Sequence, residues 1–489
     1  MGRVASEASR VGGYFLLGHS KRPPTPDPSP PRFARGEGNP TAVTTELRAT
    51  LAIAAPLAAA NLAQMAIGFT NTVMVGRLGG VPLAAAGLGA SLYVTIGIAL
   101  QGIVSALAPL AAHALGAGDR EAAARIAGQG LALALVFALP FVTMITTFDT
   151  LLLRFGYDPA LAEEIRRYQH AIVWGAPAML TMGALRSFLA AQARTRPVML
   201  VLFGGVAANA VLNWVFIYGH LGAPALGVAG AGYSTAANQW IMLVALACYL
   251  AATPDLSAAR VLRGMLAWRW SDIAAILRLG LPIGGIFLLE IGSYVGTGVL
   301  MGLIGADALA AHQIVGNCTG FTFMVSFGLA QAATVRIAYE CGSARRDVAW
   351  RAALVALTLA ICFMVAAAIV LWVAPRAIIA VYIDVLAPEN ATVVPIAVTL
   401  FAIAALFQVF DGMQAVAAGA LRGYKDTAVP MLLAALGYWG IGFLGSWVLA
   451  FPLGYGAPGL WWGLAVGTAV VGMLLAVRLY RVGAPPAVA

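Results

Sequence analysis

The chain has few charged residues for its length. Only 10% of its 489 residues are Asp, Glu, Lys or Arg, whereas soluble globular domains carry about 25% charge. At the same time 61% of the residues are hydrophobic and the mean hydropathy is +0.87. This balance excludes a soluble globular protein and predicts a chain that lies largely within a membrane.

Lysine and catalytic motifs are equally scarce. The two lysines, Lys21 and Lys425, do not follow a glycine, so a GxxxxGK[ST] phosphate-binding loop is excluded. No GxSxG, HExxH or CxxCH motif is present, and the four cysteines have no zinc or disulfide spacing. We therefore expect neither an enzyme nor a bound cofactor. Transport driven by an ion gradient is the activity that remains.

The basic residues do not indicate a nucleic-acid partner, although the net charge is +9. They are spread over the ends of apolar runs instead of clustering on one soluble face. Of the 29 basic residues, we expect five on the outer side, namely Arg77, Arg154, Arg166, Arg167 and Arg376. The positive-inside rule then predicts a multi-pass protein of a bacterial inner membrane with both termini in the cytoplasm. We expect a monomer whose partners are the bilayer and small molecules.

Apolar runs of about twenty residues recur along almost the whole chain. They predict an all-α polytopic membrane protein with about twelve transmembrane helices. The expected spans are 49–73, 84–112, 127–148, 169–191, 198–219, 229–251, 274–303, 309–338, 352–374, 392–419, 428–451 and 459–480.

The polar segments divide these spans into two sets. Residues 1–45, with seven prolines in 22–40, predict a disordered cytoplasmic tail. Residues 253–272 predict a cytoplasmic linker with an interfacial face, because arginines alternate there with Trp268 and Trp270. The expected organisation is therefore a six-helix lobe over 46–252, the linker, a six-helix lobe over 273–482, and a short cytoplasmic tail over 483–489.

The two lobes repeat each other in sequence. A shift of 226 residues superposes, without a gap, Pro56 on Pro282, Gly76 on Gly302, Gly102 on Gly328 and Gly116 on Gly342. Further on, with a slightly different offset, Arg186 falls on Arg422. Six helices per repeat give both lobes the same orientation. The pattern thus predicts a parallel repeat, with substrate bound between or within two bundles that rock against each other.

Two carboxylates, Glu290 and Asp411, lie well inside predicted spans, and both are in the second lobe. A charge at that depth costs about 2.5–3.5 kcal/mol on insertion scales and usually marks an ion or substrate path. Gln408 and Gln414 share a helical stripe with Asp411, and Tyr294 shares one with Glu290. The alternative is a structural carboxylate, but no arginine is expected at the depth of Glu290. Arg422 and its counterpart Arg186 instead predict a structural role where a helix meets the cytoplasm.

The first lobe is neutral where the second is acidic. The 226-residue shift places Gln64 on Glu290 and Asn71 on Thr297. These amides are candidates for hydrogen bonding to a substrate, or alternatively for interhelical hydrogen bonds. Asn317 is a further candidate for the cavity. We expect cation chemistry, and hence Na⁺ or H⁺ binding, at Glu290 and Asp411.

Several motifs resemble those of the multidrug and toxic compound extrusion (MATE) family, in its NorM-like branch. They are VMVGR from residue 73, LGAG from 115, LNWVFIYGHLGAPALGVAGAG from 212, AAHQIVGN from 310 and VAAGALRGYKD from 416. The resemblance covers about residues 46–482. It implies two six-helix lobes that exchange cations or protons for cationic drugs, with the coupling acids at Glu290 and Asp411. The chain departs from the family at Asn71, where an aspartate is usual, which favours coupling in the second lobe.

These observations predict a Na⁺- or H⁺-coupled multidrug efflux antiporter for organic, mostly cationic amphipathic compounds. The alternative is a flippase for lipids or polyisoprenoid precursors with a related two-lobed fold. A flippase would need several cationic residues in its cavity to bind an anionic headgroup. The predicted spans contain carboxylates and amides instead, with Arg186 and Arg278 near their ends.

Overall fold

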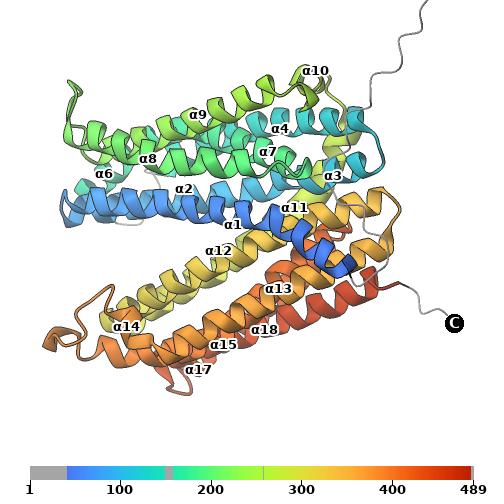
Figure 1. Ribbon diagram of the computed structural model, residues 1–489. Helices are drawn as coiled ribbons and strands as arrows, with labels where there is room; N and C mark the ends of the chain where they lie inside the picture. The colour runs from blue at the N-terminus through green and yellow to red at the C-terminus, as the bar shows by residue number, and fades with distance from the viewer. Residues whose placement is uncertain (1–40, 149–157, 257, 486–489) are drawn as a thin grey trace, which may run out of the picture.

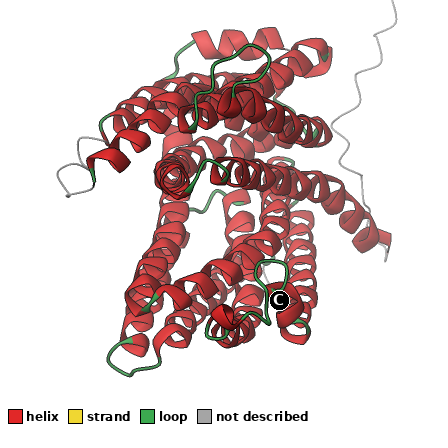
Figure 2. Ribbon diagram, turned by 90° about the vertical axis from the view of Figure 1, so that its left-hand side faces the viewer, coloured by secondary structure: helices red, strands yellow, loops and turns green. Residues whose placement is uncertain are grey.

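The structure, a computed structural model, describes residues 41–148, 158–256 and 258–485. Every regular element in this part of the chain is helical (Figure 2). Twelve of the described helical segments are long and apolar enough to cross a membrane. The predicted all-α fold is thereby confirmed, and the chain is a multi-pass membrane protein.

The described residues of the first half form eight α-helices, whose arrangement Figure 1 shows. They are α1 (Thr41–Gly76), α2 (Gly80–Ser105), α3 (Leu107–Gly116), α4 (Arg120–Thr146), α6 (Pro159–Ile172), α7 (Ala176–Ala191), α8 (Arg196–Tyr218) and α9 (Val228–Ala252). Two of the predicted spans are interrupted. One breaks at Ala106 between α2 and α3, and the other passes through a 3-10 turn, η1 (Val173–Gly175), between α6 and α7.

The second half follows a short connecting helix, α10 (Ala258–Leu266). Its helices are α11 (Trp270–Ile304), α12 (Ala306–Gly342), α13 (Arg346–Val373), α14 (Pro375–Ile379), α15 (Val393–Gly423), α16 (Ala428–Ala435), α17 (Leu444–Ala450) and α18 (Gly456–Gly483). Between α16 and α17 the chain continues as a π-helix, η4 (Leu436–Phe443). Short π-helical stretches inside α-helices are frequent at functional sites.

Two segments differ from the sequence-based expectation. The first helix begins at Thr41, inside the tail expected to be disordered; residues 1–40 of that tail lie outside the described part. The expected linker 253–272 contains η2 (Pro254–Leu256) and α10 and ends in the first turn of α11. Gln129 of α4 holds α10 in place, because its Nε2 donates to the carbonyl of Ala267 at 2.7 Å and its Oε1 accepts from the amide of Arg269 at 3.1 Å.

Each half has its own apolar core, but α1 belongs to both. The largest core cluster consists almost entirely of residues from α1 to α10. A second cluster lies in α11–α18 and also includes Ile53, Ala54 and Leu57 from the first part of α1. α1 therefore packs its first half against the second bundle and its remainder against the first.

The two halves meet through contacts that the sequence repeat relates to each other. In α2, a Cβ on Gly102 would lie 2.8 Å from Cα of Gly284 in α11. In α12, a Cβ on Gly328 would lie 2.6 Å from the backbone nitrogen of Ala58 in α1. The 226-residue shift converts the first pair into the second. Small residues thus allow the backbones to approach closely, as is usual where membrane helices pack.

A third contact is reciprocal. Gly116, at the end of α3, has no room for a side chain because the carbonyl oxygen of Tyr339 fills that space. Gly342, at the end of α12, is blocked in the same way by the carbonyl oxygen of His113. The shift exchanges these two pairs, so the contact lies on the two-fold axis of the repeat, as isologous contacts do. We call this end of the molecule the joined end.

The halves part toward the opposite end. Figure 1 shows α1 and α12 diverging from the joined end. Phe69 continues the stripe of α1 that carries Ala58, and it is 65% exposed; its repeat partner in α11, Val295, is 54% exposed. Ser91 of α2 and its repeat partner Asn317 of α12 are exposed as well. Stripes that are buried at the joined end are therefore uncovered beyond it.

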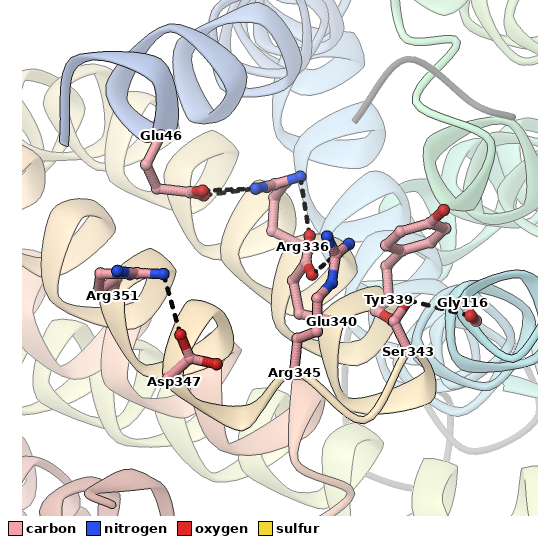
Figure 3. Close-up of polar contacts among 9 residues, drawn as sticks. All are labelled: Glu46, Gly116, Arg336, Tyr339, Glu340, Ser343, Arg345, Asp347 and Arg351. Atoms are coloured by element: carbon pink, nitrogen blue, oxygen red, sulfur yellow. Dashed lines mark hydrogen bonds and ion pairs between the residues drawn. The ribbon is translucent and has the colours of Figure 1, made fainter. Parts of the chain in front are cut away.

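A buried ion network lies close to the joined end (Figure 3). Arg336 of α12 donates to Glu46 of α1, with Nε at 3.0 Å, and its Nη1 lies 3.4 Å from Glu340. Glu340 also pairs with Arg345 at 2.7 Å. Arg336, Glu340 and Glu46 are all buried. The ion pair between Arg336 and Glu46 explains why α1 begins before the expected span 49–73. The first turns of α1 carry Glu46, which compensates the buried charge of Arg336.

The close approach of α12 and α1 predicts that a side chain at Gly328 is not tolerated. We expect Gly328→Leu to lower stability by about 1–3 kcal/mol, because overpacking forces the backbones apart. Thermal unfolding in detergent measures this. Gly204→Leu on α8 is the matched control, since no atom lies within 4 Å of a Cβ there. Equal shifts for both variants would contradict the contact.

The ion network predicts a large cost for removing its central cation. Arg336→Met removes the arginine that pairs with the buried Glu46 and leaves Glu340 with Arg345, and breaking a buried pair in this way typically costs about 3–5 kcal/mol. Arg351→Met is the control, because Arg351 pairs with Asp347 at 3.0 Å on the surface (Figure 3). Such exposed pairs contribute about 0–1 kcal/mol. Similar losses of thermal stability in the two variants would show that the network is not the stronger contact.

Candidate functional site

The structure brings the two membrane carboxylates together. Glu290 lies on α11 and Asp411 on α15. The Nε2 atom of Gln414, one turn after Asp411, donates to Glu290 Oε1 at 3.2 Å and to Asp411 Oδ1 at 3.3 Å. Because both carboxylates contact the same nitrogen, their oxygens cannot be farther apart than the sum of these distances.

The pair is only partly covered. Asp411 is 8% exposed, whereas Glu290 is partly exposed. The expected polar stripe on α11 is present, but its hydroxyl groups do not contact the acids. Ser293 donates to the carbonyl of Tyr438 at 3.3 Å, and Thr297 donates to the carbonyl of Ser293 at 2.9 Å. The one side-chain hydrogen-bond donor to Glu290 among the described residues is thus the amide of Gln414.

The π-helix η4 lies beside the acids, which sequence patterns did not predict. The indole nitrogen of Trp439 donates to the carbonyl of Leu289 at 3.0 Å, immediately before Glu290. Tyr438 is buried, and its hydroxyl has no hydrogen-bond partner among the described residues. The π-helix therefore packs against α11 on both sides of Glu290, at Leu289 and at Ser293.

A buried arginine also lies near the acids, contrary to expectation. The guanidinium carbon of Arg422 lies 5.2 Å from the ring centroid of Phe287, three residues before Glu290 on α11. Arg422 is 6% exposed, and Phe287 lies about one helical turn before Glu290. The expectation that no arginine lies near Glu290 was therefore wrong. The physical reason for the error is the length of the arginine side chain, which reaches from the last turn of α15 to the middle of α11. Helix periodicity alone does not show such a reach.

Gln408 extends the polar stripe of α15 toward α12. Its Oε1 accepts from the hydroxyl of Thr322 at 2.9 Å, while its Nε2 is buried without a partner among the described residues. Ser326, one turn along α12, also has a buried hydroxyl without a partner in this part of the chain. The stripe 408–411–414 thus provides polar groups on both sides of Asp411.

Tyr294 and Asn317 lie farther from the acids along α11 and α12. Tyr294 stacks on His312, with ring centroids 5.0 Å apart, and its hydroxyl packs against Gly316. Asn317 donates to the carbonyl of Gln313 on its own helix at 2.9 Å and is exposed on the diverging face. No described hydrogen bond joins either residue to the acid pair.

The first half holds a separate, uncharged polar cluster. Asn71 of α1 accepts from Asn213 of α8 at 2.7 Å and donates to Thr235 of α9 at 3.0 Å. Asn209 and Asn238 lie beside them, and both have buried side-chain amide atoms without a partner among the described residues. The cluster is suited to neutral hydrogen bonding. Gln64 is partly exposed and is not part of it.

The repeat shows why the acid pair exists only once. Gln64 stands at the position equivalent to Glu290. The offset that superposes Arg186 on Arg422 places Gly175 on Asp411 and Ala178 on Gln414. The first half therefore lacks all three groups that build the site in the second half.

Two carboxylates that share one amide are suited to binding a positive charge. When both are ionised they repel each other, and a cation between them relieves that repulsion. Among the described residues, no three His, Cys, Asp or Glu side chains gather into a metal site. A cation held here would therefore be bound by two carboxylates and by neutral oxygens such as that of Gln414.

Comparison with known proteins identifies the family to which this architecture belongs. The MatE family model matches residues 56–215 and 282–448, two segments that begin 226 residues apart. The "Probable multidrug resistance protein NorM" of Burkholderia mallei is 39% identical over 455 residues, 93% of this chain and 97% of that protein. The "Multidrug resistance protein NorM" of Burkholderia vietnamiensis is 40% identical over 436 residues, 88% of this chain and 93% of that protein.

Solved structures share the fold. The eukaryotic MATE transporter AtDTX14 superposes with a TM-score of 0.80 at 20% identity, covering 89% of this chain and 96% of that one. An outward-facing multidrug resistance MATE family transporter superposes with a TM-score of 0.81 at 18% identity, covering 90% of this chain and 97% of that one. The predicted resemblance is thus confirmed, and the chain belongs to the MATE family of membrane transporters.

Proposed function

We propose that this protein is a cation-coupled multidrug efflux antiporter that exchanges Na⁺ or H⁺ for organic cations. The observation that carries the proposal is the acid pair Glu290–Asp411, bridged by one amide and partly exposed. Carboxylates placed inside membrane helices without a strong partner are expensive, and they commonly mark ion paths. The relatives named as multidrug resistance proteins support the substrate class.

The geometry suggests how the two ligands exclude each other. A coupling cation that enters between the carboxylates displaces the amide nitrogen of Gln414, which would then turn its oxygen toward the ion. An organic cation that reaches the acid pair is attracted by the same two carboxylates. Because one set of charges attracts both ligands, binding of the coupling ion weakens binding of the drug, and this competition is the coupling free energy that an antiporter needs.

The two ends of the molecule support alternating access. At the joined end Gly116 packs against α12 and Gly342 against α3, while toward the opposite end Phe69 and Asn317 are exposed. We assign the joined end to the cytoplasm of a bacterial cell, with both termini on that side of the inner membrane, because basic residues concentrate near it. The structure described then corresponds to a state open to the outside.

The buried arginines favour the antiporter over a lipid flippase. Arg186 is bonded to Asn61 within the first half at 3.1 Å, and Arg422 lies on Phe287 within the second. A flippase for an anionic headgroup would need such cations gathered on one cavity surface. Here they lie in separate halves, and each contacts a neighbouring helix, Arg186 at Asn61 of α1 and Arg422 at Phe287 of α11.

The proposal predicts that neutralising either acid removes coupling. In proteoliposomes, a tenfold gradient of the coupling ion should support an ethidium gradient of at least tenfold. Glu290→Gln and Asp411→Asn should reduce that gradient to about onefold, because the site no longer binds the ion competitively. Imposing Na⁺ and pH gradients separately identifies the ion.

The matched control is Asp272→Asn, which neutralises another carboxylate of α11. Asp272 pairs with Arg125 at 2.8 Å, away from the acid pair. This variant should keep ion-driven efflux. Wild-type coupling in both Glu290→Gln and Asp411→Asn would refute the assignment.

A further inference from the structure

The connecting helix α10 exposes one face although much of that face is apolar. Toward α4 the helix packs tightly, because Val261 is buried and a Cβ on Gly264 would lie 2.8 Å from Cα of Arg125. On the other side Leu262 is 59% and Leu266 is 84% exposed. The two leucines are four residues apart, so they share one face of the helix. Leaving a leucine side chain in water costs about 1.5–3 kcal/mol relative to burying it, so this face favours an apolar surrounding.

Two tryptophans extend the exposed face where α10 ends and α11 begins. Trp268 is 44% and Trp270 is 72% exposed, and their rings form an edge-to-face pair with centroids 5.5 Å apart. Further along α11, Leu281 and Leu288 are exposed on the same side of the helix as Trp270. Tryptophan is enriched where the hydrocarbon of a membrane meets the headgroups. The pair therefore indicates headgroups beside α10 and hydrocarbon along α11.

The same region carries positive charge, and the acids nearest in sequence are already paired. Arg263 and Arg269 are both exposed, and neither forms an ion pair within the part of the chain that the structure describes. The Nε atom of Arg263 donates to a carbonyl of its own helix at 3.4 Å. Asp255 and Asp272 each pair with another arginine, at 3.1 and 2.8 Å. The exposed face thus combines apolar side chains with two guanidinium groups that are available to an anion.

We propose that this face binds anionic phospholipids of the leaflet that surrounds the joined end. The α10 surface, as we call it, consists of Leu262, Arg263, Leu266, Trp268, Arg269 and Trp270. Figure 1 shows α10 outside α4 at the joined end, on the side away from the second half. Amphipathic helices of this composition lie at the boundary between headgroups and acyl chains. The leucines and tryptophans contact the acyl chains, and the arginines bind the phosphodiester, whose oxygens match the guanidinium donors. The proposal goes beyond ion coupling at the acid pair and does not depend on it.

The α10 surface is held rigidly by hydrogen bonds from one buried amide. The Nε2 atom of Gln129 donates to the carbonyls of Gly264 and Ala267, and its Oε1 accepts from the amide of Arg269. A surface that is ordered before its ligand arrives pays less entropy on binding. These bonds reach only the backbone of α10 and of the residues that follow it. Replacing the side chain of Arg269 therefore leaves them in place, which allows the charge to be tested alone.

Native mass spectrometry of the full chain, released from detergent, tests the proposal. The first bound lipid is compared for dioleoyl phosphatidylglycerol and dioleoyl phosphatidylcholine, which have the same acyl chains and differ in net charge. A basic residue near an anionic surface contributes about 1 kcal/mol, a factor of about five in the binding constant. We expect the wild type to prefer phosphatidylglycerol. The double variant Arg263→Gln/Arg269→Gln should lower that preference about 25-fold, about fivefold for each arginine removed.

Arg376→Gln is the matched control. Arg376 is also exposed and has an exposed tryptophan, Trp372, four residues before it, but it lies on α14 at the opposite end. There the exposed acids Asp384 and Glu389 follow it in sequence and offset its charge. This variant should keep the preference of the wild type.

Four results would overturn the proposal. The wild type could bind both lipids equally, or Arg376→Gln could lose as much preference as the double variant. Soluble glycerol phosphate could displace phosphatidylglycerol at equal concentration, which would show a site for a free anion without acyl contacts. A dimer that dissociates in the double variant would show that a second copy of the chain covers the α10 surface instead of lipid.

Discussion

The constraint on which this structure depends is that a charge inside a membrane must find a partner. Near the joined end every charge of the ion network has a partner of opposite sign. Arg336 pairs with Glu46 and Glu340, and Arg345 pairs with Glu340. At the acid pair the constraint is satisfied only in part, because Glu290 and Asp411 share one neutral amide. A fully paired network stabilises one arrangement, whereas an underpaired one retains affinity for a mobile cation. The same physical cost therefore produces a structural contact in one place and a candidate binding site in another.

The repeat divides its residues between architecture and chemistry. Contacts between the halves are duplicated, as in the pairs Gly102–Gly284 and Ala58–Gly328, because both bundles must close against each other in the same way. The polar positions within each bundle are not duplicated. In the first half, Gln64 occupies the position equivalent to Glu290. With the offset that superposes Arg186 on Arg422, Gly175 occupies the position equivalent to Asp411. Symmetry is thus kept where the halves must pack and lost at the acid pair.

Much of the fold could be predicted from the sequence, because membrane spans are long apolar runs and the repeat is ungapped. The proximity of Glu290 and Asp411 followed from the helical stripe and the family resemblance. Other features could not be predicted. Tyr438 lies in a π-helix, which shifts the face that each residue presents, and Arg422 reaches Phe287 of α11 only through its long side chain. The early start of α1 depends on a partner, Arg336, that is 290 residues away from Glu46 in sequence. Local patterns carry no information about such distant pairs.

The acid pair and the contact between the halves are joined by one helix, α11. Glu290 is six residues from Gly284 on α11, about 9 Å along the axis at 1.5 Å per residue. Gly284 is where α2 meets α11, and Pro282 two residues earlier removes a backbone hydrogen bond and weakens the helix there. A change of charge at Glu290 therefore acts on a helix that is bendable next to the contact between the halves. Because the backbones touch at Gly284 without side chains between them, even a small tilt of α11 must displace α2. The acid pair and the packing between the halves are thus mechanically linked through α11.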